Sequence, residues 1–443
     1  MRVLNSFLNS LDNWSKRFSK ELMSWRHSCM KTQWIKVKDI FDIQKGKKMT
    51  VAYEQEGILH RQEKGSSLLA SSDEYQPKVY RYLQCRDLKN RIKPKYISVI
   101  GDAVTVDHKD IILVWDGVNA GDIYTGLSGV IGSTLAVLKP KNDTLICTDY
   151  IARYLQSQSP LIKSRCKGAT VRHIQREFIE NLLIPLPDIE RQRKISKILG
   201  QLELLIQKQK QAIAMVDEWI QSIFYGLFDD PVQNTKNWEM NELGSGVSSI
   251  VGGWSPVCID QPTPKNGWGV LKLSAISQGF YKEEENKTLP SQIDARETLT
   301  VQVGDLLICR KNVKELVGKC AYVFETRDHL LIPDTMFRLR IHPRSEKLDP
   351  IFLWKLLNEK NMRIKIQQLA SGSASSMLNI SKSKLLQLSI ILPPLSLQKT
   401  FASIVCKSEL KKKKMKEYLY LLEKVLLYWQ QKFHLQREDL SKQ

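Results

Sequence analysis

The side chains best suited to specific chemistry in this sequence are cations and amides that stand beside glycines. Three lysines, Lys45, Lys47 and Lys48, flank a single glycine, an arrangement suited to binding phosphate. Arg310 and Asn312 lie two positions apart, and their side chains match the major-groove edges of guanine and adenine, respectively. We therefore expect the lysines to contact phosphate and the Arg310–Asn312 pair to read bases.

Two polar segments, each opening with a glycine, add hydroxyl groups and backbone amides that also suit phosphate. One runs over residues 168–170 and the other over residues 372–376, and a polar residue follows each of them. The residues that we expect to contact a nucleic acid from these segments are Thr170, His173, Ser373, Ser375, Ser376 and Asn379.

The sequence shows none of the residue sets that would indicate a catalytic centre. It contains no Gly-x4-Gly-Lys-Ser/Thr loop, no His-Glu-x-x-His helix and no adenine-methyltransferase motif. Cys166 and His173 could form a thiolate pair, but no neighbouring residue in the sequence activates that thiol. We expect no metal site and no catalytic residue in this chain, and we interpret it as a recognition protein.

Charge indicates the class of partner. The 67 Lys and Arg residues exceed the 47 Asp and Glu residues, and the net charge of +20 favours a polyanion. The excess is spread, at +6 over residues 34–187 and +5 over residues 232–393, which suits two separate phosphate-binding surfaces. The sequence contains no apolar run of about 18 residues, so it predicts no membrane span. The eight cysteines form no Cys-x-x-Cys pair, which favours a reducing cytoplasm.

An internal repeat organises the elements that must position these residues. The stretch from Ile174 to Leu199 matches the stretch 206 positions later without a gap, so that Gln192 falls on Gln398. Upstream, each half has an apolar strand that starts with an aspartate, at Asp110 and Asp305. A repeat of this length indicates a duplicated domain followed by a helix.

The helix that ends each repeat has a seven-residue apolar period over four to five heptads, which predicts that the two helices pair as a coiled coil. Four consecutive lysines, residues 411–414, fill one full turn, so at least one of them must face the seam or its edge. The heptad residues that we expect to pack the helices and to bind partners are Ile195, Leu202, Val216, Ile223, Phe401, Met415, Leu422 and Trp429.

Changes in composition and charge along the chain divide it into five predicted segments. An N-terminal amphipathic helical segment spans residues 1–33, and it is expected to cover apolar surface on the C-terminal helix or on a partner. The domains span residues 34–187 and 232–393, with a central helix over 188–231 and a C-terminal helix over 394–443.

The ordered, duplicated set of motifs resembles the specificity subunits of type I restriction-modification systems. The turn Leu-Ile-Pro-Leu-Pro at residues 183–187 and its counterpart Ile-Leu-Pro-Pro-Leu at 391–395 resemble the entry into that family's spacer helices. Segments 115–121, 253–256, 268–274 and 310–312 resemble parts of its target recognition domains. The resemblance adds Asn119, Gly253 and Lys272 to the residues expected to bind DNA.

This resemblance implies an α+β fold, in which two duplicated α/β target recognition domains are separated by a pair of long antiparallel coiled-coil helices. Each domain would read one half of a bipartite double-stranded DNA site, and the helices would set the gap. It also implies a prokaryotic complex with two methyltransferase subunits and motor-nuclease subunits. S-adenosylmethionine, ATP and Mg would be bound by those partner subunits, so that this chain needs no cofactor.

Two other interpretations stay open at the level of sequence. The chain could be a non-catalytic coiled-coil scaffold whose duplicated domains bind protein, in which case it would not bind DNA even with its partners. It could also be a fused nuclease-methyltransferase, which the missing motifs disfavour and which activity of the isolated chain would restore.

Overall fold

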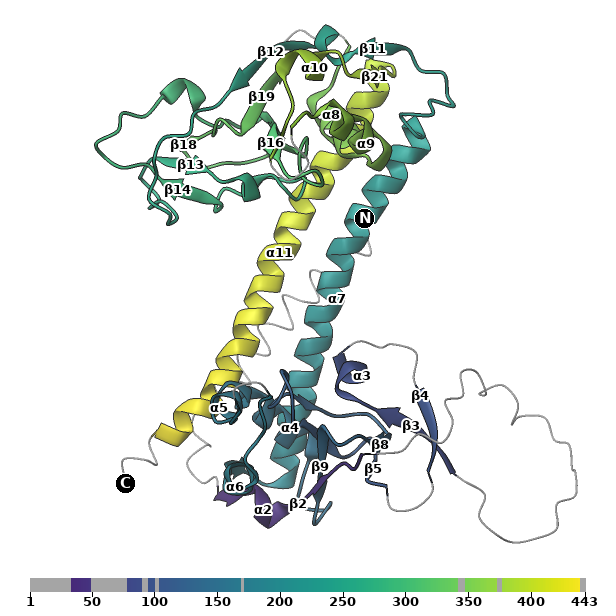
Figure 1. The fold of residues 1–443 in the computed structure, drawn as a ribbon, viewed down its shortest axis with the longest axis vertical. Coiled ribbons are helices and arrows are strands. Elements are labelled where there is room, and N and C mark those ends of the chain that lie inside the picture. Colours follow the sequence, from purple (N-terminus) through teal and green to yellow (C-terminus); the bar gives the residue numbers. More distant parts are fainter. Residues whose placement is uncertain are drawn as a thin grey trace, which may run out of the picture. The chain divides into compact units, whose positions relative to one another are not determined.

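The structure is a computed structural model, and it describes residues 33–48, 78–89, 95–99, 103–168, 171–341, 347–372 and 377–438. The chain folds into two compact units (Figure 1). The first unit holds the described residues up to Gln207 together with those from Tyr420 onward, and the second unit is Lys208–Leu419. The expected N-terminal helix over residues 1–33 lies outside the described residues, except for Gln33.

The first unit consists of short strands with small helices around them. One sheet has the strand order β2-β9-β6-β7, a second has the order β4-β3-β8-β5, and β1 pairs with β10. The strands are β1 (Gln33–Lys36), β2 (Phe41–Lys45), β3 (Lys78–Leu83), β4 (Lys95–Val99), β5 (Thr105–Val106), β6 (Ile111–Val114), β7 (Ile123–Tyr124), β8 (Gly129–Ile131), β9 (Leu135–Pro140) and β10 (Leu183–Leu186). The helices are α2 (Val37–Ile40), α3 (Cys85–Lys89), α4 (Thr148–Ser157), α5 (Ser159–Ser164) and α6 (Arg176–Glu180).

The second unit repeats this plan. Its sheets have the orders β12-β19-β15-β17 and β14-β13-β18, and β11 pairs with β21 and β16 with β20. The strands are β11 (Met240–Glu242), β12 (Val247–Gly252), β13 (Gly269–Leu271), β14 (Asn286–Thr288), β15 (Leu306–Cys309), β16 (Lys311–Asn312), β17 (Cys320–Tyr322), β18 (Leu330–Leu331), β19 (Met336–Ile341), β20 (Leu378–Asn379) and β21 (Ser389–Ile391). The helices are α8 (Pro350–Asn358), α9 (Lys360–Leu369) and α10 (Lys382–Leu386).

The duplication predicted from the sequence is confirmed strand by strand. In each unit the central strand, β9 or β19, pairs antiparallel with two neighbours, and β3 and β13 each have one antiparallel and one parallel partner. The strands that follow Asp110 and Asp305 are fully buried. Each aspartate accepts a hydrogen bond at 2.9 Å from the backbone N–H three residues earlier, and thereby closes the turn into the strand.

A buried glutamine anchors each domain to the start of its helix. Gln398 is fully buried, donates to the carbonyls of Lys347 and Pro393, and accepts from the Asp349 N–H at 2.9 Å. Gln192 makes the same three kinds of hydrogen bond in the first unit, including acceptance from the Cys147 N–H at 2.8 Å. The gapless 206-residue match in the sequence therefore reflects one anchoring network used twice.

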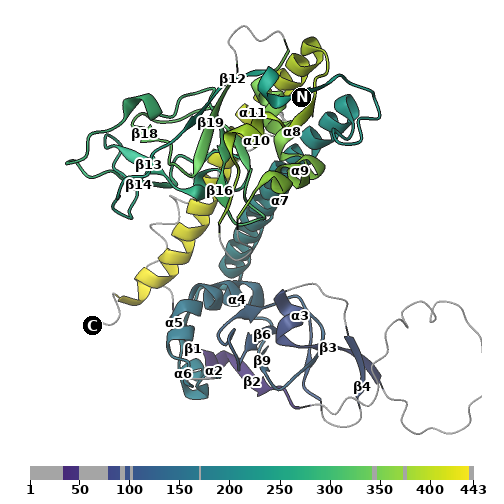
Figure 2. The same cartoon turned by 45° about the horizontal axis from the view of Figure 1, so that its top comes forward.

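The two long helices, α7 (Ile189–Phe228) and α11 (Leu395–Glu438), each pass through both units without a break. In the second unit the Gln209 side chain donates to the Met415 carbonyl at 3.0 Å, and the rings of Phe224 and Phe401 lie 5.6 Å apart. Residue numbers rise along α7 as they fall along α11, so this pairing is antiparallel, as the family resemblance implied, and the pairing itself is the one that the heptads predicted. Figure 2 shows α8 and α9 of the second unit beside both helices.

Each unit has its own hydrophobic core on these helices. In the second unit Phe352 of α8 packs against Phe224 and Phe228 of α7. In the first unit Ile195 and Leu199 belong to the core under the β2-β9-β6-β7 sheet, and Trp429 packs against the same core. Within the portion of the chain that the structure describes, no helix is long and apolar enough to cross a membrane, and no group of three or more acidic, histidine or cysteine side chains could hold a metal ion.

Candidate nucleic-acid interface

The second domain brings Arg310 and Asn379 together although 69 positions separate them. Arg310 stands at the break between β15 and β16, where its N–H donates to the Thr335 carbonyl at 2.9 Å and its carbonyl accepts from the Ile380 N–H at 2.9 Å. Strand β16 then pairs with β20, so that Lys311 lies opposite Asn379. Backbone hydrogen bonds on both sides therefore fix the place from which the Arg310 side chain extends.

An aromatic ring and an amide oxygen position the Arg310 side chain. Its Cζ atom lies 4.7 Å from the centre of the Phe337 ring, and its Nε–H donates to Asn379 Oδ1 at 3.2 Å. Among the described residues, no hydrogen bond or ion pair occupies its two terminal nitrogen atoms. Lys382 Nζ lies 5.8 Å from the centre of the same ring, so two cations lie near one aromatic side chain.

Asp334 balances some of this charge. Its carboxylate accepts from Ser255 Oγ at 2.5 Å and from Lys311 Nζ at 2.9 Å. The hydroxyl of Ser255, followed by the cations Lys311 and Arg310, holds the pKa of Asp334 below its usual value. The carboxylate is therefore ionised at neutral pH, and Lys311 can bind a phosphate only by giving up this partner.

Gly253 packs against the backbone of Ile332 and Pro333, the two residues that precede Asp334. A Cβ atom at this position would lie 2.2 Å from the Pro333 carbonyl oxygen and 2.3 Å from that of Ile332. Gly46 in the first domain has the same role, because its Cβ would lie 2.2 Å from the Gly132 oxygen. Both glycines permit close approach of two backbones rather than an unusual φ angle.

The first domain has the same backbone arrangement with different side chains. Trp115 occupies the position of Arg310, since its N–H donates to the Thr134 carbonyl and its carbonyl accepts from the Ile174 N–H. His173 bridges to Asp116 as Asn379 does to Lys311. Lys45 Nζ lies 2.8 Å from Asp116 Oδ2, so a lysine–aspartate pair occurs in both domains.

The other expected contacts of the first domain are distributed around this pair. Lys47 and Lys48 are exposed, and Lys47 forms a β-bridge with Gly132. Asn119 stands in the turn after β6, where its side chain donates to Cys85 Sγ at 3.5 Å. Thr170 lies outside the described residues.

Two residues expected from the sequence are engaged elsewhere in the second domain. Asn312 is only 7% exposed, donates to Cys309 Sγ at 3.4 Å and accepts from the Val313 N–H at 2.9 Å. The prediction that it reads a base beside Arg310 was therefore wrong, because its amide is buried and bonded. Lys272 pairs instead with Asp260, whose Oδ1 atom lies 3.1 Å from the lysine Nζ. Ser373, Ser375 and Ser376 lie outside the described residues.

Sequence reasoning missed the side chains that support the cluster. Phe337, Asp334 and Lys382 were not singled out, and neither was Arg176, which donates to the Ile43 carbonyl at 3.1 Å. One signal was present in the sequence, because Arg176 and Lys382 are 206 positions apart and so place a cation at the same point of each repeat. The possible Cys166–His173 pair gains no support, since burial raises the pKa of the Cys166 thiol and its Sγ bonds to the Ile162 carbonyl.

The heptad residues expected to bind partners are covered by this chain. Five are buried, and the others pack against the hydrophobic core of one unit or the other. The buried residues are Ile195, Leu202, Phe401, Met415 and Leu422, and the partly covered ones are Val216, Ile223 and Trp429. The heptad positions therefore form the seam inside the molecule, where this chain itself covers the side chains that were expected to bind partners.

The lysine run on α11 places one ammonium group in the seam, as the sequence predicted. Lys412 is 8% exposed and lies 2.7 Å from Asp217 Oδ1 and 2.8 Å from Glu409 Oε1. Burial lowers the pKa of Lys412, but the two carboxylates outweigh it and raise the pKa above its usual value. Lys412 is therefore charged, and it connects α11 to α7.

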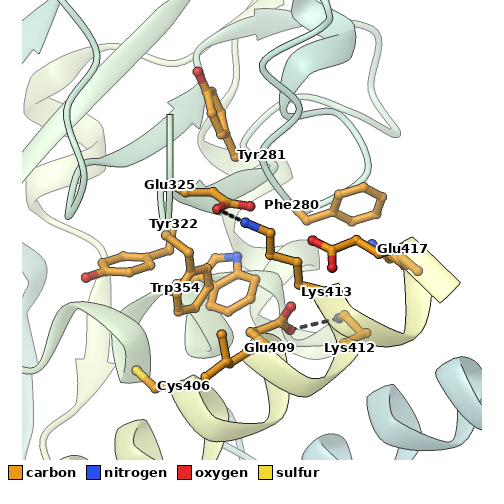
Figure 3. A pocket seen from close by; sticks show the side chains of 13 residues that line it. Phe280, Tyr281, Tyr322, Glu325, Trp354, Cys406, Glu409, Lys412, Lys413 and Glu417 are labelled. Atoms are coloured by element: carbon orange, nitrogen blue, oxygen red, sulfur yellow. Dashed lines mark hydrogen bonds and ion pairs between the residues drawn. The ribbon is translucent and has the colours of Figure 1, made fainter. Parts of the chain in front are cut away.

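A cavity of about 460 Å³ lies beside this lysine in the second unit (Figure 3). Its walls include the rings of Tyr322, Phe324 and Trp354, and an ion pair between Lys413 of α11 and Glu325 spans it. None of the residues expected to bind DNA lines the cavity. It is a feature of the contact between the second domain and α11, separate from the Arg310 cluster.

Comparisons with known proteins agree with this architecture. The profile of the family described as "Type I restriction modification DNA specificity domain" matches residues 31–215. The type I restriction enzyme MjaVIII specificity subunit of Methanocaldococcus jannaschii is 27% identical over 357 residues, which cover 76% of this chain and 81% of that protein. The EcoEI specificity subunit of Escherichia coli is 34% identical over 171 residues, covering 38% of this chain and 28% of that protein.

A solved structure shows the same fold. The type I restriction-modification S subunit from M. genitalium superposes with a TM-score of 0.57 at 14% sequence identity, covering 91% of this chain and 96% of that one. The profile covers the first repeat, and the strand-by-strand duplication described above relates the second repeat to it. Residues 31–215 therefore match the type I restriction-modification DNA specificity family, and the chain as a whole is similar to specificity subunits of that family in sequence and in fold.

Proposed function

We propose that this specificity subunit reads a bipartite double-stranded DNA site, with one half-site bound by each duplicated domain. The observation that supports the proposal most directly is the exchange of side chains on one repeated backbone. Trp115 and Asp116 of the first domain stand where Arg310 and Lys311 stand in the second. A common scaffold that presents different side chains is what reading two different half-sites requires.

Phosphate contacts would orient each domain on the duplex. Lys45, Lys47 and Lys48 supply them in the first domain, and Lys311 and Lys382 in the second. Lys45 and Lys311 are each paired with an aspartate, at 2.8 and 2.9 Å, respectively. When DNA binds, a phosphate can replace that carboxylate as the partner of the lysine. In the free protein the aspartate offsets the charge of the lysine and so reduces its repulsion from neighbouring cations. Removal of one such lysine should reduce the salt dependence of DNA binding by about one unit of slope.

The outward faces of the helices are the proposed docking surface for partner subunits. Large apolar side chains are exposed there although the heptad seam is closed, which is typical of a surface that a protein partner covers. They include Met215 and Trp219 on α7 and Leu410, Tyr420 and Leu421 on α11.

The partners would be two methyltransferase subunits and the motor-nuclease subunits. S-adenosylmethionine, ATP and Mg would be bound on those chains, so that this chain contributes recognition without catalysis. The domain limits at 34–187 and 232–393, and the helix limits at 188–231 and 394–443, belong to the same proposal.

The spacer role can be tested by lengthening both helices together. Gln209 and Met415 face each other in the seam, so one heptad inserted beside each keeps the apolar register of the pair. Seven residues add about 10 Å to each helix at about 1.5 Å per residue. We expect the reconstituted methyltransferase to tolerate a gap between half-sites that is longer by up to about three base pairs, at about 3.4 Å each.

The controls separate the possible outcomes. An insertion beside Gln209 alone breaks the seam and should abolish activity. A matched insertion that leaves the gap unchanged, with full activity, would contradict the spacer role. A protein scaffold without a DNA role would assemble with the same partners and leave DNA methylation without any sequence preference.

A further inference from the structure

We infer that Phe337 and Asn379 hold Arg310 as a preset fork for a guanine at one position of the half-site read by the second domain. This inference rests on the proposed function and adds the base class and the positioning residues. Asn379 then acts through Arg310 rather than on a base itself, since its Oδ1 atom accepts from Arg310 Nε at 3.2 Å.

The geometry leaves the correct end of Arg310 available. The Nε–H is used by Asn379, and the guanidinium lies over the Phe337 ring with Cζ 4.7 Å from the ring centre. The two terminal nitrogens have no hydrogen bond or ion pair to any described residue. Two parallel N–H groups at the end of a guanidinium match the O6 and N7 acceptors of guanine.

The support beneath Arg310 is rigid. Phe337 is 1% exposed, lies in β19 at the middle of its sheet and pairs with Gly252 on one side and Ile308 on the other. Gly252 has no side chain, and a Cβ there would come no closer than 3.8 Å to the ring. The ring face is thus open to the guanidinium, and holding the arginine before DNA arrives reduces the side-chain entropy lost on binding.

The first domain has no equivalent fork among its described residues. Trp115 occupies the position of Arg310, is 7% exposed and belongs to the hydrophobic core of its unit. The residue equivalent to Asn379 is His173, which is exposed. We therefore predict a guanine contact of this kind in one half-site and none from the equivalent position of the other.

The test uses the full chain, assembled with its methyltransferase subunits, and sequences all methylated sites in DNA. Arg310→Ala should reduce discrimination at a single guanine of one half-site by about 5- to 150-fold, the fold-change that corresponds to about 1–3 kcal/mol per bidentate contact. Asn379→Ala should weaken discrimination at the same guanine, by about three- to tenfold, with the other half-site unchanged. Phe337→Leu should also weaken discrimination at this guanine. A thermal unfolding measurement shows whether this variant is folded.

Lys382→Ala is the matched control, because Lys382 lies over the same ring at 5.8 Å but carries no fork. It should lower methylation at all sites without changing the motif. The inference is overturned if Arg310→Ala keeps every guanine preference, or if Asn379→Ala relaxes a different position. A wild-type complex that methylates DNA with no bipartite motif would instead contradict the proposed function itself.

Discussion

Two adjacent glycines, Gly252 and Gly253, should respond very differently to replacement by alanine, with a large loss of stability only at Gly253. A Cβ at Gly253 would lie 2.2 and 2.3 Å from two carbonyl oxygens, whereas a Cβ at Gly252 would meet nothing closer than 3.8 Å. Ordinary C···O contacts lie near about 3.3 Å, so Gly253→Ala must push the two backbones apart by roughly 1 Å. Neither glycine has a positive φ angle, so crowding alone separates the two cases.

The expected magnitude follows from the contacts that would be lost. Overpacking of this kind destabilises by about 1–3 kcal/mol, and the displaced Trp254 N–H to Ile332 carbonyl bond, 3.0 Å long, adds about 1 kcal/mol. Gly253→Ala should therefore lower the unfolding free energy of the second unit by about 2–4 kcal/mol. In a unit of this size that lowers the unfolding temperature by roughly 4 to 16 °C.

Gly252→Ala should change stability by no more than about 0.5 kcal/mol, or raise it slightly by restricting the unfolded chain. Calorimetry of the full chain measures the change, and hydrogen exchange of β12 and β19 assigns it to the second unit, with β2 and β9 as the internal reference. Equal destabilisation by the two substitutions would refute the close-approach argument.

Three further predictions concern buried or paired polar groups. Gln398→Leu and Gln192→Leu should each destabilise their own unit by about 2–4 kcal/mol, because each removes three partly or fully buried hydrogen bonds to the backbone; denaturant unfolding in which either variant matches the wild type would contradict the anchoring role. Lys412→Met should destabilise the helix pair by about 1–3 kcal/mol, because Glu409 loses its cation, and adding Glu409→Gln should recover some of this loss in chemical unfolding. Asp334→Asn should remove about 0–1 kcal/mol at neutral pH, since the pair is half-exposed. The pKa of Asp334 is lower in the folded protein, so its contribution is full above about pH 4 and declines as the pH falls through the folded value; a difference that stayed constant down to about pH 2 would argue against it.

Much of the fold could be predicted from the sequence because the residues that recur in the two repeats are mostly buried. The apolar strands after Asp110 and Asp305, and the pair Gln192 and Gln398, recur because the same hydrogen bonds recur. Heptad periodicity also predicted that the two helices pair, and the lysine run predicted at least one lysine at the seam or its edge, which is Lys412.

The heptads could not show what covers each face of a helix. Periodicity identifies residues that share a face, but a partner subunit and a second helix of the same chain produce the same pattern. Met415 and Leu422 are buried by their own chain for this reason, and the exposed apolar residues, such as Tyr420, lie at positions that the pattern leaves unspecified.

The interface was harder to predict, because it depends on where a strand breaks. Arg310 and Asn312 were expected to act together because their side chains match guanine and adenine, respectively, and residues two positions apart share a face only along a continuous strand. The strand is interrupted at Arg310, between β15 and β16, and Asn312 therefore turns into the interior. The true neighbour of Arg310 is Asn379, which no local pattern could identify because 69 positions separate the two.

Under the proposed function, the two duplicated domains read two separate half-sites of DNA. The most direct measurement is single-molecule sequencing of methylated DNA from cells that express this chain with its methyltransferase partners. We predict one motif made of two specified half-sites, different from each other and separated by an unspecified gap of constant length. A single uninterrupted motif, or methylation without sequence preference, would contradict it.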